Sequence, residues 1–159
     1  MAATVPLTWA EFAAQAPELA EHGRRLLYQH GPGLAFLATV RRDGAPRLHP
    51  ICPTIVDGGL YALIGASPKR GDLVRDGRYA LHAHQGDQSD DEFFLAGRAR
   101  RLDDAALREA VFAALTSTGV QPGAEDSLFE FRIERALHAA YASRGQWPPA
   151  RTIWPPPSR

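Results

Sequence analysis

Short apolar runs separated by tight turn signals constrain the fold of this chain more than any other feature. The runs span residues 34–40, 47–56 and 60–65. Asp43-Gly44 lies between the first two, and Asp57-Gly58-Gly59 lies between the second and the third. Asp-Gly turns between apolar segments are typical of β-hairpins. The chain also has 13 prolines and 14 glycines, which interrupt it too often for a helical bundle. Consecutive antiparallel strands are therefore predicted.

Three more segments have the length and pattern of strands, at residues 79–84, 92–102 and 127–141. Six strands with hairpin links and helices outside them predict a mainly β, α+β fold, in which a small six-stranded antiparallel barrel carries peripheral helices. The side chains of a barrel this small fill its interior, so a large ligand has to bind outside it or between two copies. This predicts a site at a dimer interface.

Helical signals lie at the start of the chain and before the last strand. Thr8 and Glu11 have the spacing of a capping box, and an apolar helical face follows through two short helices that separate near Pro17. Asp103 is the predicted cap of a helix over 104–115, and a polar linker follows over 116–126. Residues 1–159 are predicted to form one domain, with a helical N-terminal extension over 1–30.

Composition excludes several classes of partner. Lys plus Arg and Asp plus Glu are equal at 18 each, so no global positive field attracts nucleic acid or an anionic membrane. The single Cys52 cannot form an internal disulfide, and neither a secretory signal nor a long apolar span is visible. We expect a soluble, cytoplasmic protein that binds a small molecule.

A candidate anion site follows the third apolar run, where Ser67-Pro68-Lys69-Arg70 turns a strand into a helix. Ser is a good helix cap and Pro suits the first helical position. The unpaired N–H groups of the first turn, together with Lys69 and Arg70, would face an anion at the end of the strand. A capped surface helix with solvated cations is the alternative interpretation of these residues alone.

The order of these motifs resembles the flavin-binding split-barrel family related to pyridoxamine 5′-phosphate oxidase. The resemblance covers about half of the chain, residues 31–104. It rests on the Asp-Gly turn, an Arg-x-His-Pro strand, the Gly-Gly turn and the Ser-x-Lys-x-x-Asp-Leu segment. It implies a homodimer that binds FMN at the subunit interface and transfers a hydride at N5 of the flavin to or from a small molecule.

The resemblance also implies which residues bind the cofactor. The strand after the first hairpin would lie along the flavin, with a basic side chain on its phosphate, and the end of the third strand would contact the ring and ribityl chain. The helix start would hold the phosphate. The implied residues are Arg47, His49, Pro50, Ile51, Leu63, Ile64, Gly65, Ser67, Lys69 and Arg70. Pro68 stands where the oxidase often has a basic residue, and the oxidase's long C-terminal segment is absent, so pyridoxamine phosphate oxidation itself is not expected.

Other cofactors and roles remain open at this stage. The deazaflavin F420 could use the same Lys-bearing helix start, and haem is a minor alternative because relatives of the split barrel use a His ligand. His82 and His84 share a strand face, but no other ligand motif accompanies them, so no metal site is predicted. Cys52 is interpreted as a core residue. A non-catalytic cofactor carrier is the remaining alternative.

The C-terminal tail, residues 145–159, is rich in Pro and Trp, and we expect neither an ordinary helix nor a strand there. Exposed indoles are costly, so we expect Trp147 and Trp154 to dock on the partner subunit near the flavin. A disordered polyproline ligand for another protein is the competing interpretation.

Overall fold

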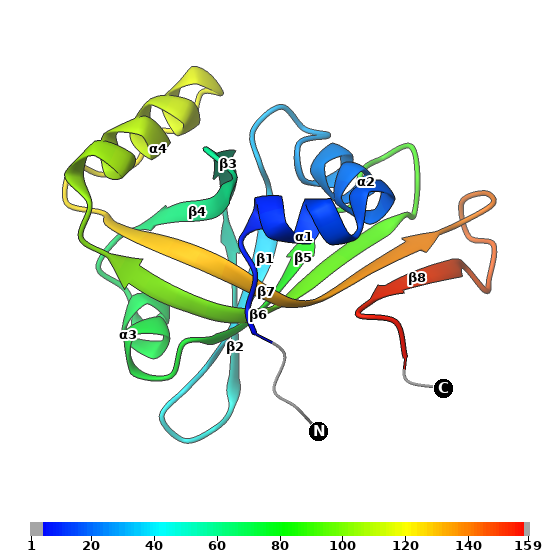
Figure 1. Ribbon diagram of the computed structural model, residues 1–159, viewed down its shortest axis with the longest axis horizontal. Coiled ribbons are helices and arrows are strands. Elements are labelled where there is room, and N and C mark those ends of the chain that lie inside the picture. The colour runs from blue at the N-terminus through cyan, green and yellow to red at the C-terminus, as the bar shows by residue number, and fades with distance from the viewer. Residues whose placement is uncertain (1–4, 158–159) are drawn as a thin grey trace.

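A computed structural model describes residues 5–157 and shows one strongly curved antiparallel sheet with helices packed against it (Figure 1). Its elements, in chain order, are α1 (Trp9–Gln15), α2 (Pro17–Leu27), β1 (Ala35–Val40), β2 (Pro46–Ile51), β3 (Thr54–Val56), β4 (Gly59–Ile64), α3 (Pro68–Arg75), β5 (Arg78–Ala83), β6 (Glu92–Leu102), α4 (Ala105–Ser117), β7 (Ser127–Ala140) and β8 (Ala150–Trp154).

The strand order requires the sheet to curl into a barrel. The order is β2-β1-β5-β6-β7-β4-β3, so β2 and β3 lie at opposite ends of the path. Only Cys52 and Pro53 separate these two strands in the chain. Two residues cannot cross an open sheet, because each residue spans at most about 3.6 Å. The two edges must therefore meet, as the predicted barrel requires.

The number of strands differs from the predicted six, because the described residues form eight. The run over 47–56 is two strands, since Pro53 has no N–H to donate to a ladder and the chain changes from one sheet edge to the other there. The eighth strand, β8, lies in the tail and pairs with Ala136–Ala140 of β7. The prediction of a tail without a strand is thus wrong, since the prolines flank residues 150–154 rather than interrupt them.

The long strand β7 joins the parts of the sheet. It pairs with β6 along its length, with β4 through Ser127–Glu130 and with β8 through Ala136–Ala140. A register shift in the β6–β7 pair lies between Ala96 and Gly97. A Cβ at Gly97 would lie 2.0 Å from the carbonyl oxygen of Arg132, so only glycine allows the two backbones to approach this closely.

The N-terminal helices cover one part of the core, as predicted. The capping box is present, with the Thr8 hydroxyl accepting from the Glu11 N–H at 3.2 Å and the Glu11 carboxylate accepting from the Thr8 N–H at 2.7 Å. The helices separate at Pro17. The predicted apolar face is at most 3% exposed at each of its members, Phe12, Leu19, Leu26 and Leu27.

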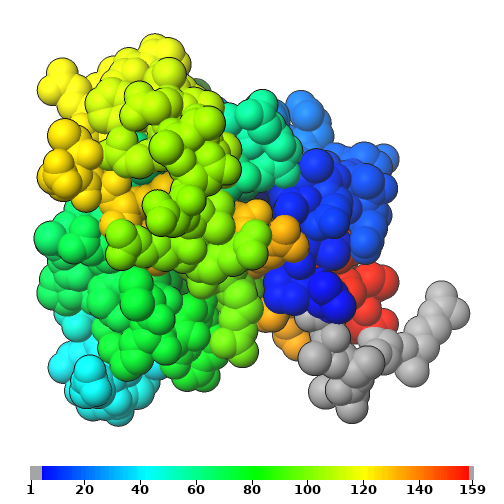
Figure 2. Space-filling view, turned by 60° about the vertical axis from the view of Figure 1, so that its left-hand side comes forward, coloured from blue at the N-terminus to red at the C-terminus, as the bar shows by residue number. Residues whose placement is uncertain are grey.

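Helix α4 packs on β3 and β4, away from the N-terminal helices (Figure 1). Its cap is Asp104 rather than the predicted Asp103, because the Asp104 carboxylate accepts a 2.9 Å hydrogen bond from the Leu107 N–H. Val111 and Leu115 are buried, as the predicted spacing requires. In Figure 2, α4 lies at the top of the face that carries α3, and the turn between β1 and β2 (cyan) lies at the lower left.

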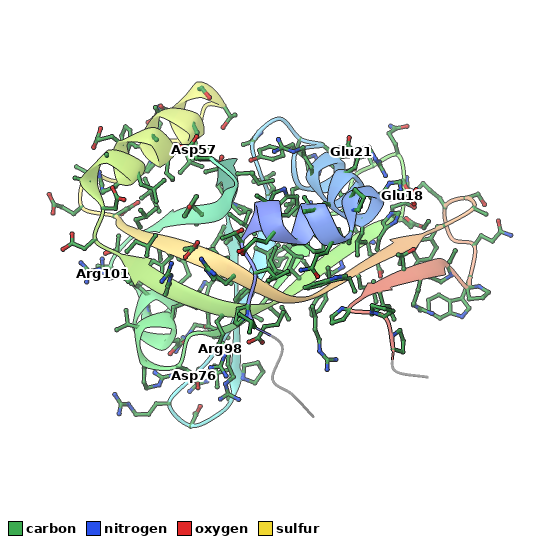
Figure 3. All side chains as sticks on the ribbon, viewed as in Figure 1. Glu18, Glu21, Asp57, Asp76, Arg98 and Arg101 are labelled. Carbon is green, nitrogen blue, oxygen red and sulfur yellow. The ribbon has the colours of Figure 1, made fainter. Side chains whose placement is uncertain are left out.

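Most charged side chains lie on the outside of the molecule, and Asp72 and Glu130 are buried exceptions. Figure 3 labels Glu18 and Glu21, which are exposed on α2, and Arg98 and Arg101, which are exposed on β6. Among the described residues, no helix has both the length and the apolar character needed to cross a membrane.

Candidate functional site

The first turn of α3 carries the donors that an anion requires. Ser67 is the cap by backbone position, and Pro68 follows it. The Ser67 hydroxyl donates back to the carbonyl oxygen of Gly65 at 3.0 Å instead of accepting from the helix. Pro68 has no N–H, and no side chain caps the N–H groups of the next two residues, Lys69 and Arg70. Backbone donors and the Lys69 ammonium group thus lie at the same helix start.

A pocket of about 240 Å³ opens beside this helix start. Six of the predicted cofactor residues line it: Pro50 and Ile51 from β2, Leu63 and Ile64 from β4, Gly65, and Lys69. Its walls are mostly apolar, and Lys69 is its one cation among the lining residues. Cofactor pockets have this composition, a mainly apolar surface with few polar groups. The structure therefore brings half of the predicted set together in one place.

The opposite wall comes from a segment that the sequence identified only as a polar linker. Leu115 at the end of α4, Val120, Gln121, Pro122 and Asp126 line the pocket. Arg108 anchors this segment, because its Nε donates to the Asp126 carbonyl oxygen at 3.1 Å and its terminal nitrogen bonds the Ala124 carbonyl. No local sequence signal identifies these residues, since their place depends on how α4 packs on β3 and β4.

Two residues of this pocket, Cys52 and Asp126, have a thiol and a carboxylate whose states are set by their surroundings. Cys52 lines it and is half-buried, and burial raises the pKa of its thiol, so the neutral form is favoured. The Asp126 carboxylate accepts from the Gly123 N–H at 2.8 Å. A Cβ at Gly65 would lie 2.9 Å from the other Asp126 oxygen, so the loop and the end of β4 approach closely.

Arg47 and His49 share a face of β2, as predicted, and both are half-buried. They face the same side as Thr39 and Leu37 of β1, their register partners. Arg47 does not line the pocket. Its Nε donates to Asp72 Oδ2 of α3 at 2.8 Å. Arg47 is therefore fixed, through Asp72, to the same helix whose start carries Lys69.

Asp72 is the centre of a buried polar cluster. Its side chain is 5% exposed and accepts hydrogen bonds from Thr39, Arg47 and Arg75 at 2.9, 2.8 and 3.2 Å. Burial alone would raise the pKa of Asp72, but these hydrogen bonds together hold it below its usual value. The carboxylate is thus charged and binds both arginines.

The histidines lie on another part of the surface. Nδ1 of His82 lies 2.7 Å from the Ala83 carbonyl oxygen, which makes Nδ1 the hydrogen-bond donor of this pair. The His84 ring stacks on Phe36 with centroids 5.3 Å apart, and its Nδ1 lies 3.0 Å from the Gln85 carbonyl oxygen. Within residues 5–157, no group of three or more His, Cys, Asp and Glu side chains has the arrangement of a metal site.

Solved structures share this architecture. A haem-binding protein from Mycobacterium smegmatis is 18% identical, with a TM-score of 0.59 over 82% of this chain and 56% of that one. HupZ from group A Streptococcus is 16% identical, with a TM-score of 0.63 over 77% and 95%. A Clostridium acetobutylicum protein of the pyridoxinephosphate oxidase family, related to general stress protein 26 of B. subtilis, is 13% identical, with a TM-score of 0.59 over 91% and 94%.

The chain has the split-barrel fold of pyridoxamine 5′-phosphate oxidase-like proteins. These identities show the fold and leave the cofactor open. The chain spans little more than half of the Mycobacterium smegmatis protein. No protein-family model and no curated protein matches the sequence significantly.

The two tail tryptophans of this split barrel lie in different surroundings. Trp154 is 8% exposed in the core of its own chain, where its ring meets Phe12 with centroids 5.3 Å apart. The prediction that Trp154 docks on a partner subunit is wrong, because β8 carries its ring onto α1. Trp147 is 69% exposed, with the Arg151 guanidinium 5.1 Å from its ring centroid. Neither ring lines the pocket beside α3.

Proposed function

We propose that this protein is a flavin-dependent oxidoreductase that binds FMN between two copies of the chain. One observation carries the proposal: an apolar pocket meets Lys69 and the uncapped first turn of α3. A phosphate dianion requires a cation and N–H donors together. FMN, when bound, supplies hydride transfer at N5 to or from a small molecule.

The pocket residues fit the two ends of FMN. Lys69 and the N–H groups of Lys69 and Arg70 bind the phosphate. Pro50, Ile51 and Leu63 give the isoalloxazine ring an apolar surface that excludes water on one side. Gln121 adds the pocket's one side-chain amide, which positions the ring by a hydrogen bond. The residues of the chain bind and orient the cofactor and contribute no acid or base to the transfer.

A second copy of the chain completes the site in this proposal. The pocket volume of about 240 Å³ is smaller than the roughly 300–1,000 Å³ of pockets that enclose a small-molecule ligand. The pocket is also open to the outside. A tricyclic ring that rests in it therefore keeps an uncovered face, and a neighbouring subunit covers that face.

The outer face of the sheet carries exposed apolar side chains through which two copies of the chain would associate. We call it the outer apolar face. Leu48 is 64% exposed, Ile153 43% and Phe36 37%. Strand register aligns further apolar side chains with them across β2, β1, β5, β6, β7 and β8, namely Pro46, Pro50, Ala38, Val40, Ala80, Phe94, Ala96 and Leu137. Contiguous apolar surface of this extent is typical of protein interfaces. Pro50 belongs to this face and to the pocket.

The cofactor that purifies with the protein tests the proposal. Its absorption spectrum and mass after release should be those of FMN. A deazaflavin spectrum would support F420 in the same pocket, and a haem spectrum would contradict the flavin assignment. Steady-state turnover with reduced FMN then separates an enzyme from a carrier, because a carrier binds the flavin without turnover.

Haem is the second candidate, and one observation favours it. His82 lies on the outer apolar face, next to Phe36 in the strand register, and its Nδ1 is taken by the Ala83 carbonyl oxygen, so Nε2 is the nitrogen that remains for a ligand. Imidazole is a common axial ligand of haem iron, and apolar surface suits the macrocycle. If haem purifies with the protein, His82→Ala should abolish the shift of the haem Soret band that axial ligation causes. Lys69→Ala should leave that shift unchanged.

A further inference from the structure

A basic hollow lies beside the C-terminal half of α3, away from the pocket at the start of the helix. It measures about 340 Å³ and forms between the β1–β2 turn, β2 and the end of α3. Four arginines and two aspartates line it: Arg41, Arg42, Asp43, Arg47, Asp72 and Arg75. Its formal charge is therefore +2, from four positive and two negative side chains. The proposed flavin site does not use this hollow.

The hollow is built before any ligand arrives. Asp72, whose side chain is 5% exposed, holds Arg47 from β2 and Arg75 from α3. Arg75 also donates to the carbonyl oxygen of Val40. The side chains of Arg47 and Arg75 keep exposed fractions of 28% and 31%, so they are fixed and still partly open to solvent. Fixed arginines lose little side-chain entropy when they bind a ligand.

The remaining two arginines supply unused donors at the rim. Arg41 forms one ion pair, with Asp43 at 3.0 Å, and the side chain of Arg42 makes no ion pair or hydrogen bond with any described residue. The terminal nitrogens of Arg47 also have no partner within residues 5–157, since the ion pair with Asp72 uses Nε. Guanidinium donors in this number match the oxygens of phosphate or carboxylate groups.

Helix α3 connects the hollow with the pocket. Lys69, Asp72 and Arg75 follow each other at intervals of three residues, so they share one side of the helix. Lys69 lines the pocket and Arg75 lines the hollow. Arg75 follows Lys69 by six positions, which corresponds to a rise of about 9 Å along the helix axis. The two anion-binding surfaces therefore lie within the length of a small molecule.

We propose that the hollow binds a small polyanionic compound, one that carries two or more phosphate or carboxylate groups, beside the cofactor. This deepens the proposed function by naming the substrate class, and it rests on that function in taking Lys69 as the position of the cofactor phosphate. The four arginines neutralise the ligand, and Asp72 keeps Arg47 and Arg75 in position.

Binding of inorganic tripolyphosphate to the full chain, measured by isothermal titration calorimetry at low ionic strength, tests the hollow. Arg41→Gln/Arg42→Gln should weaken binding by about tenfold, the size expected from loss of two solvent-exposed ionic contacts. The matched control is Arg24→Gln/Arg101→Gln, because both of these arginines are exposed outside the hollow and the change in net charge is the same. Equal losses in the two double variants would overturn the proposal, since tripolyphosphate would then sense only net charge.

A parallel FMN titration separates this proposal from the proposed function. Arg41→Gln/Arg42→Gln should bind FMN within about twofold of the unmodified chain, because Arg41 and Arg42 line the hollow and not the pocket beside the proposed phosphate position. If FMN binds to no form of the protein but tripolyphosphate still depends on Arg41 and Arg42, the flavin function fails and the anion site stands. A loss of FMN binding in this double variant as large as in Lys69→Ala would overturn the two-site arrangement.

Discussion

Lys69 is the one residue on which the proposed cofactor site depends most. It is the only lysine in the sequence, against 17 arginines, and it lies where the apolar pocket meets the first turn of α3. An ammonium group binds phosphate as a compact point charge, whereas the arginines of the hollow act as planar forks. The lysine thus lies at the proposed cofactor pocket, and the arginines line the neighbouring hollow.

Lys69→Ala should weaken FMN binding by about 1.5–3 kcal/mol, the usual contribution of a charge-assisted hydrogen bond. Titration by flavin fluorescence measures this change. Riboflavin lacks the phosphate and should bind both proteins about equally. Arg101→Ala removes an exposed cation away from the pocket and serves as the control. An FMN dissociation constant that is the same for Lys69→Ala and the unmodified chain would exclude this phosphate site.

Asp72 should make stability depend on acid pH. Its lowered pKa stabilises the fold at every pH above the unfolded value of about 3.9, and this contribution is lost as pH falls through the folded pKa. Asp72→Asn should therefore destabilise the protein by about 1–3 kcal/mol at pH 7, since Arg47 and Arg75 lose a buried partner. Urea unfolding at pH 7 and pH 3 measures both free energies. The difference between the two proteins should shrink at pH 3, and a constant difference would contradict the assigned role.

The sequence predicted some site residues and not others for a physical reason. Leu63, Gly65 and Lys69 lie close together in the sequence, where a strand turns into a helix. A local pattern therefore identifies them. The ion pair of Arg47 with Asp72 joins residues 25 positions apart and depends on how α3 packs beside β2. No local pattern contains that information. The Ser67 hydroxyl also differs from the prediction of a helix cap. It donates to the Gly65 carbonyl oxygen instead of accepting a hydrogen bond from the helix.

At the scale of elements, turn chemistry predicted most of the strands and packing decided the rest. The strand at Glu92–Leu102 and the helix break at Pro17 follow directly from the sequence. Three features do not: the change of sheet edge at Cys52-Pro53, the wall that residues 120–126 give the pocket, and β8. The change of sheet edge depends on the pairing of β4 with β7, the pocket wall depends on how α4 packs on β3 and β4, and β8 depends on its pairing with β7.

Strand β8 makes the two tail tryptophans unequal in their effect on stability. Trp154→Ala should lower the free energy of unfolding by about 3–5 kcal/mol, because the indole fills space against Phe12. Trp147→Ala should change it by no more than about 0.5 kcal/mol, since its ring is 69% exposed. Urea unfolding followed by circular dichroism measures both. Similar losses in the two variants would show that β8 does not hold Trp154 in the core.

At the scale of the whole molecule, the barrel places two incomplete surfaces next to each other. The pocket beside α3 is too small and too open to enclose a tricyclic ring, and the outer apolar face exposes Leu48 and Phe36. Pro50 belongs to both surfaces. A symmetric dimer that covers the outer apolar face would therefore also close the pocket, and the two copies would form two equivalent sites.

Cofactor binding and association should consequently fail together. Leu48→Asp places a charge on the outer apolar face, where a partner would have to bury it without a counter-ion. We expect light scattering to give twice the 17.3 kDa chain mass for the FMN-loaded protein and a single chain mass for this variant, with FMN affinity reduced at least tenfold. Val74→Asp is the matched control, because Val74 is 62% exposed on α3, outside that face, and should leave both measurements unchanged. The circular dichroism spectra of both variants should match the unmodified chain, since each side chain is mostly in solvent. A Leu48→Asp monomer that binds FMN normally would show that one chain suffices for the site.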